Sequence, residues 1–398
     1  MLHFDQDPKD PAFVQDPYGF YARLRDSGPL AYWTELGVPV LTGYDGVSMV
    51  LRDNRFGREA PQGFAHPIPK GLQHFYEIDA HSMLELEGER HRRLRGLVLR
   101  AFTSRRIKDL MPDITAICDD LLDKIDTRAG ETDLLQRFCQ PLPVRVISRL
   151  LGVPEEMCDQ LLAWSNAMVA VYTPMRTPAI ETAAEQAARE FSTFMRRYVE
   201  ARRTTPRDDL ITHLIAAEEG GEKLSTDELI STCILLLNAG HEATVHSLGI
   251  AVKTLLETDT PPDALTDGAI DATLEEVLRY DPPLHFFDRW VYEDMCFMGH
   301  EFKRGDKVGL LLASANRDET AWDEADRFRP ARAIKQNMAF GVGLHFCVGA
   351  PLARLEMRVA LPRLFERYPD LALAAPPDYA NTWHFHGLRS LRVRLGQK

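Results

Sequence analysis

The stretch from residue 340 to residue 351 restricts the fold of this chain more than any other. It reads Phe-Gly-Val-Gly-Leu-His-Phe-Cys-Val-Gly-Ala-Pro, with Cys347 among glycines that allow a tight turn around its sulfur. An apolar run from Leu352 to Leu364 follows at helical spacing, and Pro351 stands where a first helical turn tolerates proline. We therefore expect the sulfur at a helix N-terminus, where amide donors and the helix dipole favour the thiolate over the thiol.

Cys347 has no neighbouring cysteine or histidine at the spacing that a zinc site or an iron–sulfur cluster needs. A single thiolate suits the axial position of a haem instead. A cysteine among glycines is, taken alone, more often structural, but the whole pattern Phe-Gly-x-Gly-x-His-x-Cys-x-Gly is long and specific. It resembles the haem-binding loop of the cytochrome P-450 monooxygenases, and the resemblance covers nearly the whole chain. It implies haem b with Cys347 as the axial iron ligand, and no flavin in this chain.

Composition and charge exclude several other classes. The chain has 398 residues, of which 45% are hydrophobic and 27% charged, enough to bury a large core. A formal net charge of -12 argues against non-specific binding to nucleic acid or to an anionic membrane. Six scattered cysteines indicate reduced thiols. The N-terminus is acidic, unlike a signal peptide, and the longest apolar run is too short to span a bilayer. We expect a monomeric cytoplasmic protein.

No repeat, low-complexity tract or linker divides the sequence, so we expect a single haem-thiolate monooxygenase domain over residues 1–398. Its expected class is mainly α with a small β-rich portion assembled from both ends of the chain. Helices are predicted over about 45–280, with breaks at 60–80 and near Tyr172. A hairpin is predicted over 30–42, and later strands at 296–298, 308–312 and 383–395, with a turn at 303–306.

One predicted helix is unusually long. Ser225-Thr-Asp-Glu228 forms a capping box, and the helical pattern that follows continues to about Glu257. The resemblance implies the cytochrome P-450 fold, in which this helix crosses over the haem.

Within that helix, residues 237–244 read Leu-Asn-Ala-Gly-His-Glu-Ala-Thr and resemble the family's oxygen-binding segment, Ala-Gly-x-[Asp/Glu]-Thr. The resemblance implies that Ala239 and Gly240 make room beside the iron and that Glu242 feeds protons. The family's usual hydroxyl residue is replaced by Ala243, and Thr244 lies one step on, turned by about 100° around the helix. Either a hydroxyl or bound water of the substrate supplies the missing group, or Thr244 or Glu242 suffices through water; both hypotheses stay open here.

Three further residues resemble the family's structural network behind the cysteine loop. Glu276-Val-Leu-Arg279 matches Glu-x-x-Arg, whose spacing puts both side chains on one helical face. Residues 328–332, Phe-Arg-Pro-Ala-Arg, match Phe-x-Pro-x-Arg, so Arg332 is the third member. An isolated Glu-x-x-Arg is usually a solvated ion pair. Three motifs in family order imply a buried ionic network that fixes the loop.

The two haem propionates need cations. His91-Arg-Arg-Leu-Arg95 resembles the family segment His-x-Arg-Leu-Arg, whose first and last residues share one helical face. The resemblance adds Arg289 and His345 to this set. Further residues that it places against the cofactor are Phe340, Gly341, Gly349 and Ala239.

By position, the substrate pocket is expected to draw on residues 60–80, 168–172, 236–243, 284–287 and 383–386. Its aromatic content favours a mainly apolar ligand, although aromatic side chains are also ordinary core. The sequence does not distinguish a terpenoid, a macrolide, a fatty acid, a peptide or a small aromatic compound. The named members of the pocket are Leu236, Leu284, Phe286, Phe287 and Phe385.

Residues 90–108 hold eight arginines or lysines and no acid, in a chain whose net charge is negative. A basic patch here would steer an acidic electron carrier such as a ferredoxin. The alternative is that these bases serve propionates or surface acids. Since 398 residues leave no room for a fused reductase, electrons are expected from a separate partner. The expected docking residues are Arg92, Arg93, Arg105, Arg354 and Arg358.

The function implied is a haem-thiolate monooxygenase that inserts one oxygen atom from O2 into a C–H bond of a mainly apolar small molecule. The resemblance assigns the catalytic segment to Gly240, Glu242, Ala243 and Thr244. One alternative is a peroxide-driven peroxygenase of the same fold; the missing hydroxyl at 243 favours it, and the retained acid at 242 opposes it. The other alternative is a catalytically silent haem or ligand-binding protein, against which the intact cysteine loop and network argue.

Overall fold

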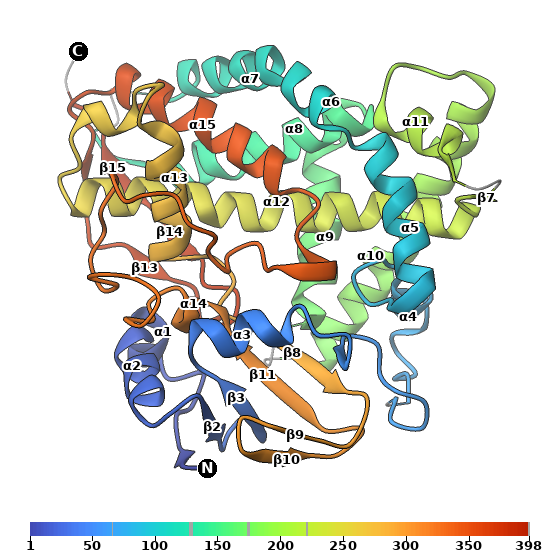
Figure 1. Cartoon of the computed structure of the whole chain (residues 1–398). Coiled ribbons are helices and arrows are strands. Elements are labelled where there is room, and N and C mark those ends of the chain that lie inside the picture. Colours follow the sequence, from blue (N-terminus) through green and yellow to red (C-terminus); the bar gives the residue numbers. More distant parts are fainter. Residues whose placement is uncertain (66, 127–129, 173–175, 220–221, 397–398) are drawn as a thin grey trace.

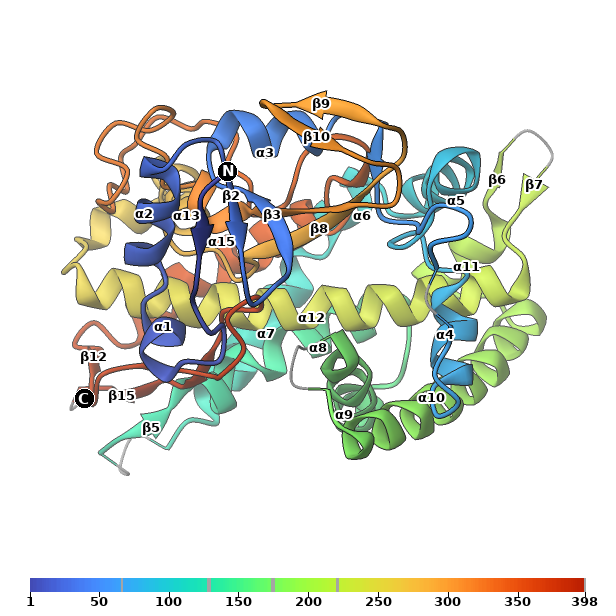
Figure 2. The same ribbon diagram turned by 90° about the horizontal axis from the view of Figure 1, so that it is seen from below.

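The structure is a computed structural model that describes residues 1–65, 67–126, 130–172, 176–219 and 222–396. Its organising element is the helix α12 (Thr226–Glu257), which crosses the whole molecule in Figures 1 and 2. The predicted capping box is present: the Ser225 hydroxyl accepts from the Glu228 amide, and the Glu228 carboxylate accepts from the Ser225 amide. At 1.5 Å per residue, its 32 residues extend about 48 Å.

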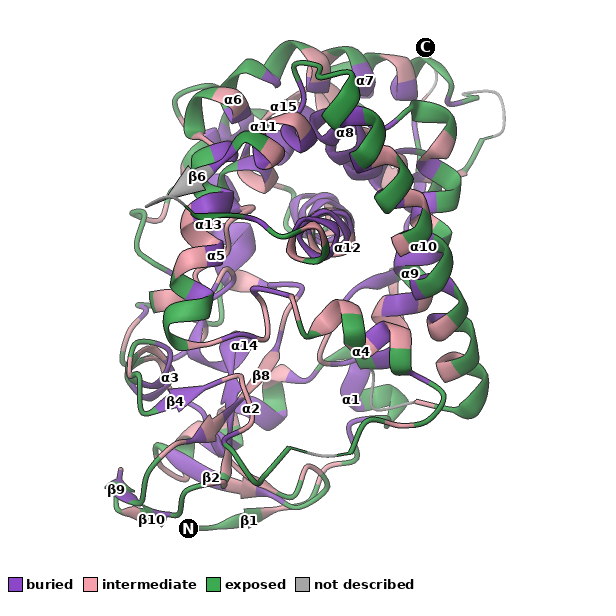
Figure 3. Ribbon diagram, turned by 90° about the vertical axis from the view of Figure 1, so that its right-hand side faces the viewer, coloured by how far each residue is buried: buried purple, intermediate pink, exposed green. Residues whose placement is uncertain are grey.

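The helices that pack against α12 are α8, α9, α10, α13 and α15. Together with the other helices, they confirm the predicted mainly α class. Figure 3 shows α12 end-on, coloured as largely buried, with the other elements around it. The helices besides α12 are α1 (Pro11–Gln15), α2 (Tyr18–Asp26), α3 (Tyr44–Val50), α4 (Gln73–Asp79), α5 (Gly88–Ala101), α6 (Ser104–Asp109), α7 (Met111–Asp123), α8 (Pro141–Leu151), α9 (Cys158–Val169), α10 (Pro178–Thr204), α11 (Leu210–Ala216), α13 (Ile270–Tyr280), α14 (Leu312–Ala315) and α15 (Ala350–Arg367).

Short tight segments join several of these helices. A π-helix, η2 (Leu135–Cys139), runs directly into α8. The 3-10 segments are η3 (Glu155–Met157), η4 (Ala170–Tyr172), η5 (Pro262–Leu265) and η6 (Gly343–His345). The break predicted near Tyr172 begins at η4, and its continuation through residues 173–175 lies outside the described residues. Among the described residues, no helix combines the length and the apolar character needed to cross a membrane.

A six-stranded sheet lies at the end of the molecule where the N-terminus is found (Figure 1). Its strands are ordered β1-β2-β3-β11-β8-β4, so residues near the N-terminus and residues around 290–310 share one sheet, as predicted. The expected hairpin is β2 paired antiparallel with β3, and β11 joins β3 in parallel. The strands are β1 (His3–Phe4), β2 (Leu30–Trp33), β3 (Val38–Leu41), β4 (Phe56–Gly57), β8 (Phe286–Val291) and β11 (Lys307–Leu311).

The remaining strands form small hairpins and a three-stranded sheet. The predicted strand at 296–298 is displaced by one residue to β9, because Met298 has a φ of 50° and begins the turn into β10. The expected turn at 303–306 is present, with the Asp306 amide donating to the Lys303 carbonyl at 3.0 Å. The prediction of a strand over 383–395 was too long, since only its last part is extended. These strands are β5 (Thr132–Asp133), β6 (Glu218–Glu219), β7 (Glu222–Lys223), β9 (Met295–Phe297), β10 (His300–Phe302), β12 (Ala372–Leu373), β13 (Asp378–Tyr379), β14 (Leu388–Ser390) and β15 (Arg392–Arg394).

Candidate haem-thiolate site

The cysteine loop runs from Met338 to the start of α15. Gly341 and Gly343 have φ angles of 64° and 75°, a conformation that favours glycine. A Cβ at position 343 would lie 2.3 Å from the Leu51 carbonyl oxygen, so the loop packs directly on the backbone after α3. The Cys347 amide donates to the Phe340 carbonyl at 3.0 Å and closes the loop. The sulfur therefore lies just before the N-terminus of α15, where the sequence places it.

Opposing effects act on the protonation of Cys347. Burial raises the pKa of its thiol, although the amides of Gly349 and Ala350 and the nearby Arg95 and Arg354 act in the opposite direction. The sequence displays the helix N-terminus but not the burial, which is the larger effect here. A metal ligand must be deprotonated, and a bound metal cation favours the thiolate.

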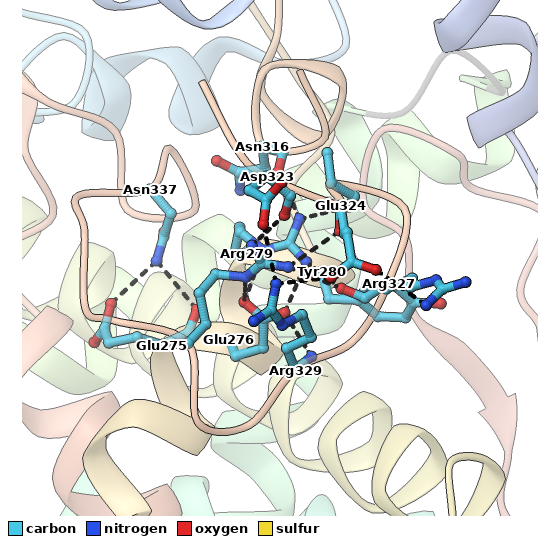
Figure 4. A network of polar contacts seen from close by, with 12 residues as sticks. Glu275, Glu276, Arg279, Tyr280, Asn316, Asp323, Glu324, Arg327, Arg329 and Asn337 are labelled. Carbon is cyan, nitrogen blue, oxygen red and sulfur yellow. Dashed lines mark hydrogen bonds and ion pairs between the residues drawn. The ribbon is translucent and has the colours of Figure 1, made fainter. Parts of the chain in front are cut away.

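Figure 4 shows the ionic network behind the loop. Arg279 donates to both carboxylate oxygens of Glu276 at 2.8 Å, and Arg332 donates to Glu276 Oε2 at 2.9 Å. The side chains of Glu276 and Arg279 are each 1% exposed. Arg279 also donates to the carbonyl of Asn316, whose side-chain oxygen accepts from the Met338 amide. The network thus reaches the first residue of the cysteine loop.

The histidines expected near the propionates lie together. The rings of His91 and His345 are 4.2 Å apart between centroids. His91 Nδ1 is bonded to the Met83 carbonyl at 2.8 Å, whereas its buried Nε2 has no partner among the described residues. Burial and His345 lower the pKa of His91. His345 Nε2 is bonded to Glu87, and Arg95 donates to the Phe346 carbonyl. A carboxylate beside the free Nε2 of His91 would favour the ring protonated at both nitrogens, in which Nε2 donates to an acceptor that the protein itself does not supply.

Arg289 lies on β8, and the structure adds a second arginine beside it. β4 pairs with β8 so that Gly57 faces Trp290, which places Arg58 next to Arg289. Both guanidinium groups lie over the ring of Phe287, at 5.5 and 5.8 Å from its centroid. Burial, and then Arg58, lower the pKa of Arg289 to about 10. Sequence reasoning missed Arg58, because only the pairing of strands more than 200 residues apart brings it here. Arg58 is partly exposed and also pairs with Glu85, whereas Arg289 is buried, and the two adjacent guanidinium groups together suit an anionic group.

One face of α12 is left uncovered by protein in the middle of the molecule. Ala239 is exposed there, and Gly240, Glu242, Ala243 and His246 are partly exposed, whereas the intervening residues are mostly buried. Their spacing of three to four residues defines one stripe of the helix. A buried helix with an open stripe of small and acidic residues fits a flat cofactor and a ligand lying against it.

The acid in this stripe lies between two histidines that sequence reasoning did not assign. Glu242 is 3.6 Å from His241 Nε2 and 3.7 Å from His246 Nε2. Burial acts to raise the pKa of Glu242, but the two histidines outweigh it and lower that pKa. Thr244 is 3% exposed, and its hydroxyl donates to the Gly240 carbonyl at 3.1 Å. Thr244 therefore turns away from the open stripe, as its position predicts.

The segments expected to form the pocket come together in part. Leu284 and Phe385 form an isolated β-bridge, which joins the 284–287 and 383–386 segments. Phe286, Phe287 and both bridge residues are partly exposed, and Leu236 is buried. Tyr172, which is 47% exposed, donates to Asp79 at 3.1 Å and so connects η4 to the end of α4. Burial and Glu85 raise the pKa of Asp79 to about 7.

Most of the arginines expected to bind an electron carrier are paired within the protein. Arg93 pairs with Glu228, Arg354 with Glu275, and Arg358 with Asp271. Arg105 lies 3.9 Å from Asp109 on an exposed helical turn, and Arg92 is exposed. A hollow of about 230 Å³ lies beside Arg354 and is lined by Phe340, Phe346, Ile334 and Asn337 among others.

These features define a haem-thiolate protein: a cysteine loop anchored by a buried ionic network, histidine and arginine side chains gathered beside it, and an uncovered helical face. The comparisons agree. The cytochrome P-450 family model matches residues 32–261 and 269–378. The polyketide biosynthesis protein PksS of Bacillus subtilis is 36% identical over 98% of both chains. The monooxygenase PikC of Streptomyces venezuelae is 37% identical, over 96% of this chain and 92% of PikC.

Solved structures are similar over the same length. BioI, solved with an acyl carrier protein ligated to hexadec-9Z-enoic acid, superposes with a TM-score of 0.91 at 32% identity, over 97% of this chain and 99% of BioI. The solved PksS superposes with a TM-score of 0.89, over 98% of this chain and all of PksS. The chain belongs to the cytochrome P-450 family. It is therefore a haem b monooxygenase that acts on a small molecule and takes electrons from a separate partner.

Proposed function

We propose that Cys347 provides the axial thiolate, with Glu276, Arg279 and Arg332 holding its loop, within one domain formed by residues 1–398. When bound, haem with a thiolate ligand activates dioxygen for insertion of one oxygen atom into a C–H bond. The observation that carries the proposal is the uncovered stripe of α12 around Ala239 and Ala243, in a molecule whose cysteine loop is anchored from behind. The other residues proposed to contact the cofactor are His91, Arg95, Arg289, His345, Phe340, Gly341, Gly349 and Ala239.

The test is the carbon monoxide spectrum of the reduced protein. We expect the Soret band of thiolate-ligated haem in the wild type and its loss in Cys347→Ser. Cys296→Ser is the matched control, because Cys296 is an exposed cysteine and its removal should leave the band unchanged. A thiolate-type band that survives in Cys347→Ser would contradict the assignment.

The proposed substrate is a mainly apolar small molecule of the size of a polyketide, a class that the name of the similar PksS also indicates. It would lie against the uncovered stripe of α12, between Leu236, Leu284, Phe286, Phe287 and Phe385. Tyr172 and Asp79 offer a polar contact at the side of η4. A screen of macrolides, sterols, fatty acids and small aromatic compounds for displacement of iron-bound water tests this class. Binding of the small aromatic compounds alone would contradict it.

For proton delivery we propose that the substrate supplies the hydroxyl or water that Ala243 lacks, with Glu242 as the proton source. Thr244 supports this, because its hydroxyl is already bonded to Gly240. Ala243→Thr restores a hydroxyl at the family position. With a ligand from the screen, we expect little change in product formed per NADH consumed. A large gain would show that the missing group was not supplied by the substrate.

We further propose that an acidic electron carrier such as a ferredoxin docks on the face that carries α5 and the start of α15, with this chain as a monomer. Arg92 and Arg105 are the most exposed of the expected residues, and Arg93, Arg354 and Arg358 would contribute through the edges of their ion pairs. Arg92→Glu should slow reduction by a ferredoxin, most strongly at low ionic strength. Arg207→Glu, an exposed change near α11, is the control. Equal effects of both variants would contradict this docking face.

A further inference from the structure

The two segments that carry four of the proposed pocket residues are bound to each other by their backbones. The His285 amide donates to the His384 carbonyl at 3.0 Å, and the His386 amide donates to the Pro283 carbonyl at 2.7 Å. Side chains alternate along extended segments, so Leu284 and Phe286 turn one way and His285 the other. The burial follows this alternation: Leu284, Phe286 and Phe385 are partly exposed, whereas His285 and His386 are 0% and 1% exposed.

Behind these segments lies a buried carboxylate, Asp281, directly after α13. Its Oδ1 accepts from the Tyr18 hydroxyl at 2.7 Å and lies 3.3 Å from His386 Nδ1. Its Oδ2 accepts from the Tyr379 hydroxyl. Burial acts to raise the pKa of Asp281, but the bond to His386 and the charges around it hold that pKa well below its usual range. Asp281 is therefore an ionised group with 4% exposure, which needs a cation close to it.

The hydrogen bonds of His386 identify that cation. Its Nε2 is 2.8 Å from the Val14 carbonyl oxygen, which can only accept, so Nε2 carries a proton. Its Nδ1 faces the Asp281 carboxylate, which also can only accept, so Nδ1 carries a proton as well. With both nitrogens protonated, His386 is an imidazolium. The ring of Tyr379 stacks on it at 3.8 Å between centroids, with an interplanar angle of 10°.

The second histidine of the cluster is neutral. Burial and His386 lower the pKa of His285 well below its usual value. Its Nδ1 is 3.0 Å from the Tyr21 hydroxyl, and its Nε2 lies 3.9 Å from Asp281 with no other partner among the described residues. The surrounding charged groups are Lys253 of α12, which acts on Asp281, and Arg317, which lies over the Tyr18 ring at 3.5 Å. Residues of α1, α2, α12 and β13 thus converge on Asp281, directly after α13.

We infer that the buried Asp281–His386 ion pair is a positioning device that fixes the relative placement of the 284–287 and 383–386 segments, and through them the shape of the substrate pocket. The inference rests on the proposed pocket, because its effect on ligands passes through Leu284, Phe286 and Phe385. Asp281 and His386 touch neither substrate nor cofactor in this arrangement. The ion pair thereby selects among ligands by size, through the shape of the pocket. Helices α1 and α2 contribute to this positioning, because Val14 and Tyr18 supply the remaining hydrogen bonds of the pair.

The test compares two azoles that bind haem iron through one nitrogen but differ in bulk, imidazole and clotrimazole. In Asp281→Asn and in His386→Gln, we expect the spectral Kd of clotrimazole to rise about tenfold while that of imidazole changes less than about twofold. Each single variant leaves one buried charge without its partner and can therefore fail to fold. The double variant Asp281→Asn/His386→Gln removes both charges but keeps hydrogen-bond donors and acceptors, so it should still fold and can be used in the same assay. Arg389→Gln breaks an exposed ion pair on the same hairpin, between Arg389 and Asp378, and should leave both constants unchanged.

Two further readouts separate this role from simple loss of stability. In ¹⁵N-histidine-labelled protein, in its reduced carbon monoxide form at pH 7, both ring nitrogens of His386 should carry protons. Zinc analysis tests the other arrangement that the side chains permit, since Asp281, His285 and His386 lie close enough together to hold a metal ion. One zinc per chain, lost in the variants, would overturn the ion pair, and equal changes in both azole constants would overturn the positioning role. Loss of the carbon monoxide band would instead point to failure of the haem assignment.

Discussion

The hydroxyl of Thr244 donates to the carbonyl oxygen of Gly240, one turn earlier on α12, at 3.1 Å. Threonine hydroxyls commonly bond in this way within helices, and a hydroxyl so placed adds no donor to the open stripe. We therefore expect Thr244→Val to leave the hydrogen peroxide released per NADH consumed within about twofold of the wild type. The measurement uses a ligand from the spectral screen and a ferredoxin with its reductase.

Glu242→Gln is the matched comparison in the same assay, because Glu242 is partly exposed on the stripe and ionised beside His241 and His246. Its loss should increase the hydrogen peroxide released per NADH consumed several-fold, because the proton transfers that a positioned acid or base assists are slowed, typically by about 10²–10⁴-fold. An equally large increase in Thr244→Val would show that the threonine takes part in proton delivery.

Removal of the Glu276 charge should destabilise the whole cysteine loop. Glu276 accepts from Arg279, Arg332 and the Arg329 amide, and its side chain is 1% exposed. Glu276→Gln leaves two cations without a carboxylate, which we expect to cost about 3–5 kcal/mol in the free energy of unfolding. Urea denaturation followed by far-ultraviolet circular dichroism measures this. Glu324→Gln breaks only exposed pairs with Arg327 and Arg329 and should cost about 0–1 kcal/mol. Similar costs for both variants would contradict a buried network.

Glu356 predicts a pH dependence of stability. It lies on α15 with 1% exposure, its Oε2 has no partner among the described residues, and burial raises its pKa well above the usual value. Because the pKa of Glu356 is higher in the folded than in the unfolded state, protonated Glu356 contributes its full stabilisation at low pH. The free energy of unfolding then falls as the pH rises above the pKa of the unfolded state, about 4.3. Glu356→Gln removes this loss, so its stability advantage over the wild type should grow by about 1.4 kcal/mol per pH unit in that window.

Denaturation series from pH 4 to pH 8 test this expectation. Glu366→Gln changes an exposed carboxylate on the same helix and is the control. A stability difference between Glu356→Gln and the wild type that does not vary with pH would mean that Glu356 is ionised in the folded protein.

Local signals in the sequence predicted the parts of the fold that depend on nearby residues. The capping box at Ser225 and the helix to Glu257 are examples, because caps and helical periodicity act within a few residues. The sequence shows the amides at the helix N-terminus that lower the pKa of the Cys347 thiol but not the burial that raises it, because desolvation depends on residues packed from elsewhere in the chain. Arg58 was missed for the same reason, since only the β4–β8 register places it beside Arg289.

The buried cluster around Asp281 shows a further limit. His285 and His386 fall in segments that the sequence assigns to the pocket. Whether a side chain in an extended segment faces the ligand or the core depends on the register between segments 100 residues apart, which the Leu284–Phe385 bridge sets. Sequence reasoning located the segments, and the structure decided which face each histidine takes.

His91 provides a direct test of the propionate site. Its ring is 1% exposed, its Nδ1 is held by Met83, and its Nε2 lacks a partner among the described residues. A haem propionate accepting from Nε2 would form a charge-assisted bond, so His91→Phe should lose haem about tenfold faster than the wild type. Transfer of haem to excess apomyoglobin, followed at the Soret band, measures the rate. His91→Gln keeps a donor and should lie between the two, and His213→Gln, which alters a pair with exposed Asp208, should match the wild type. If His91→Phe releases haem no faster than His213→Gln, then His91 does not hold a propionate.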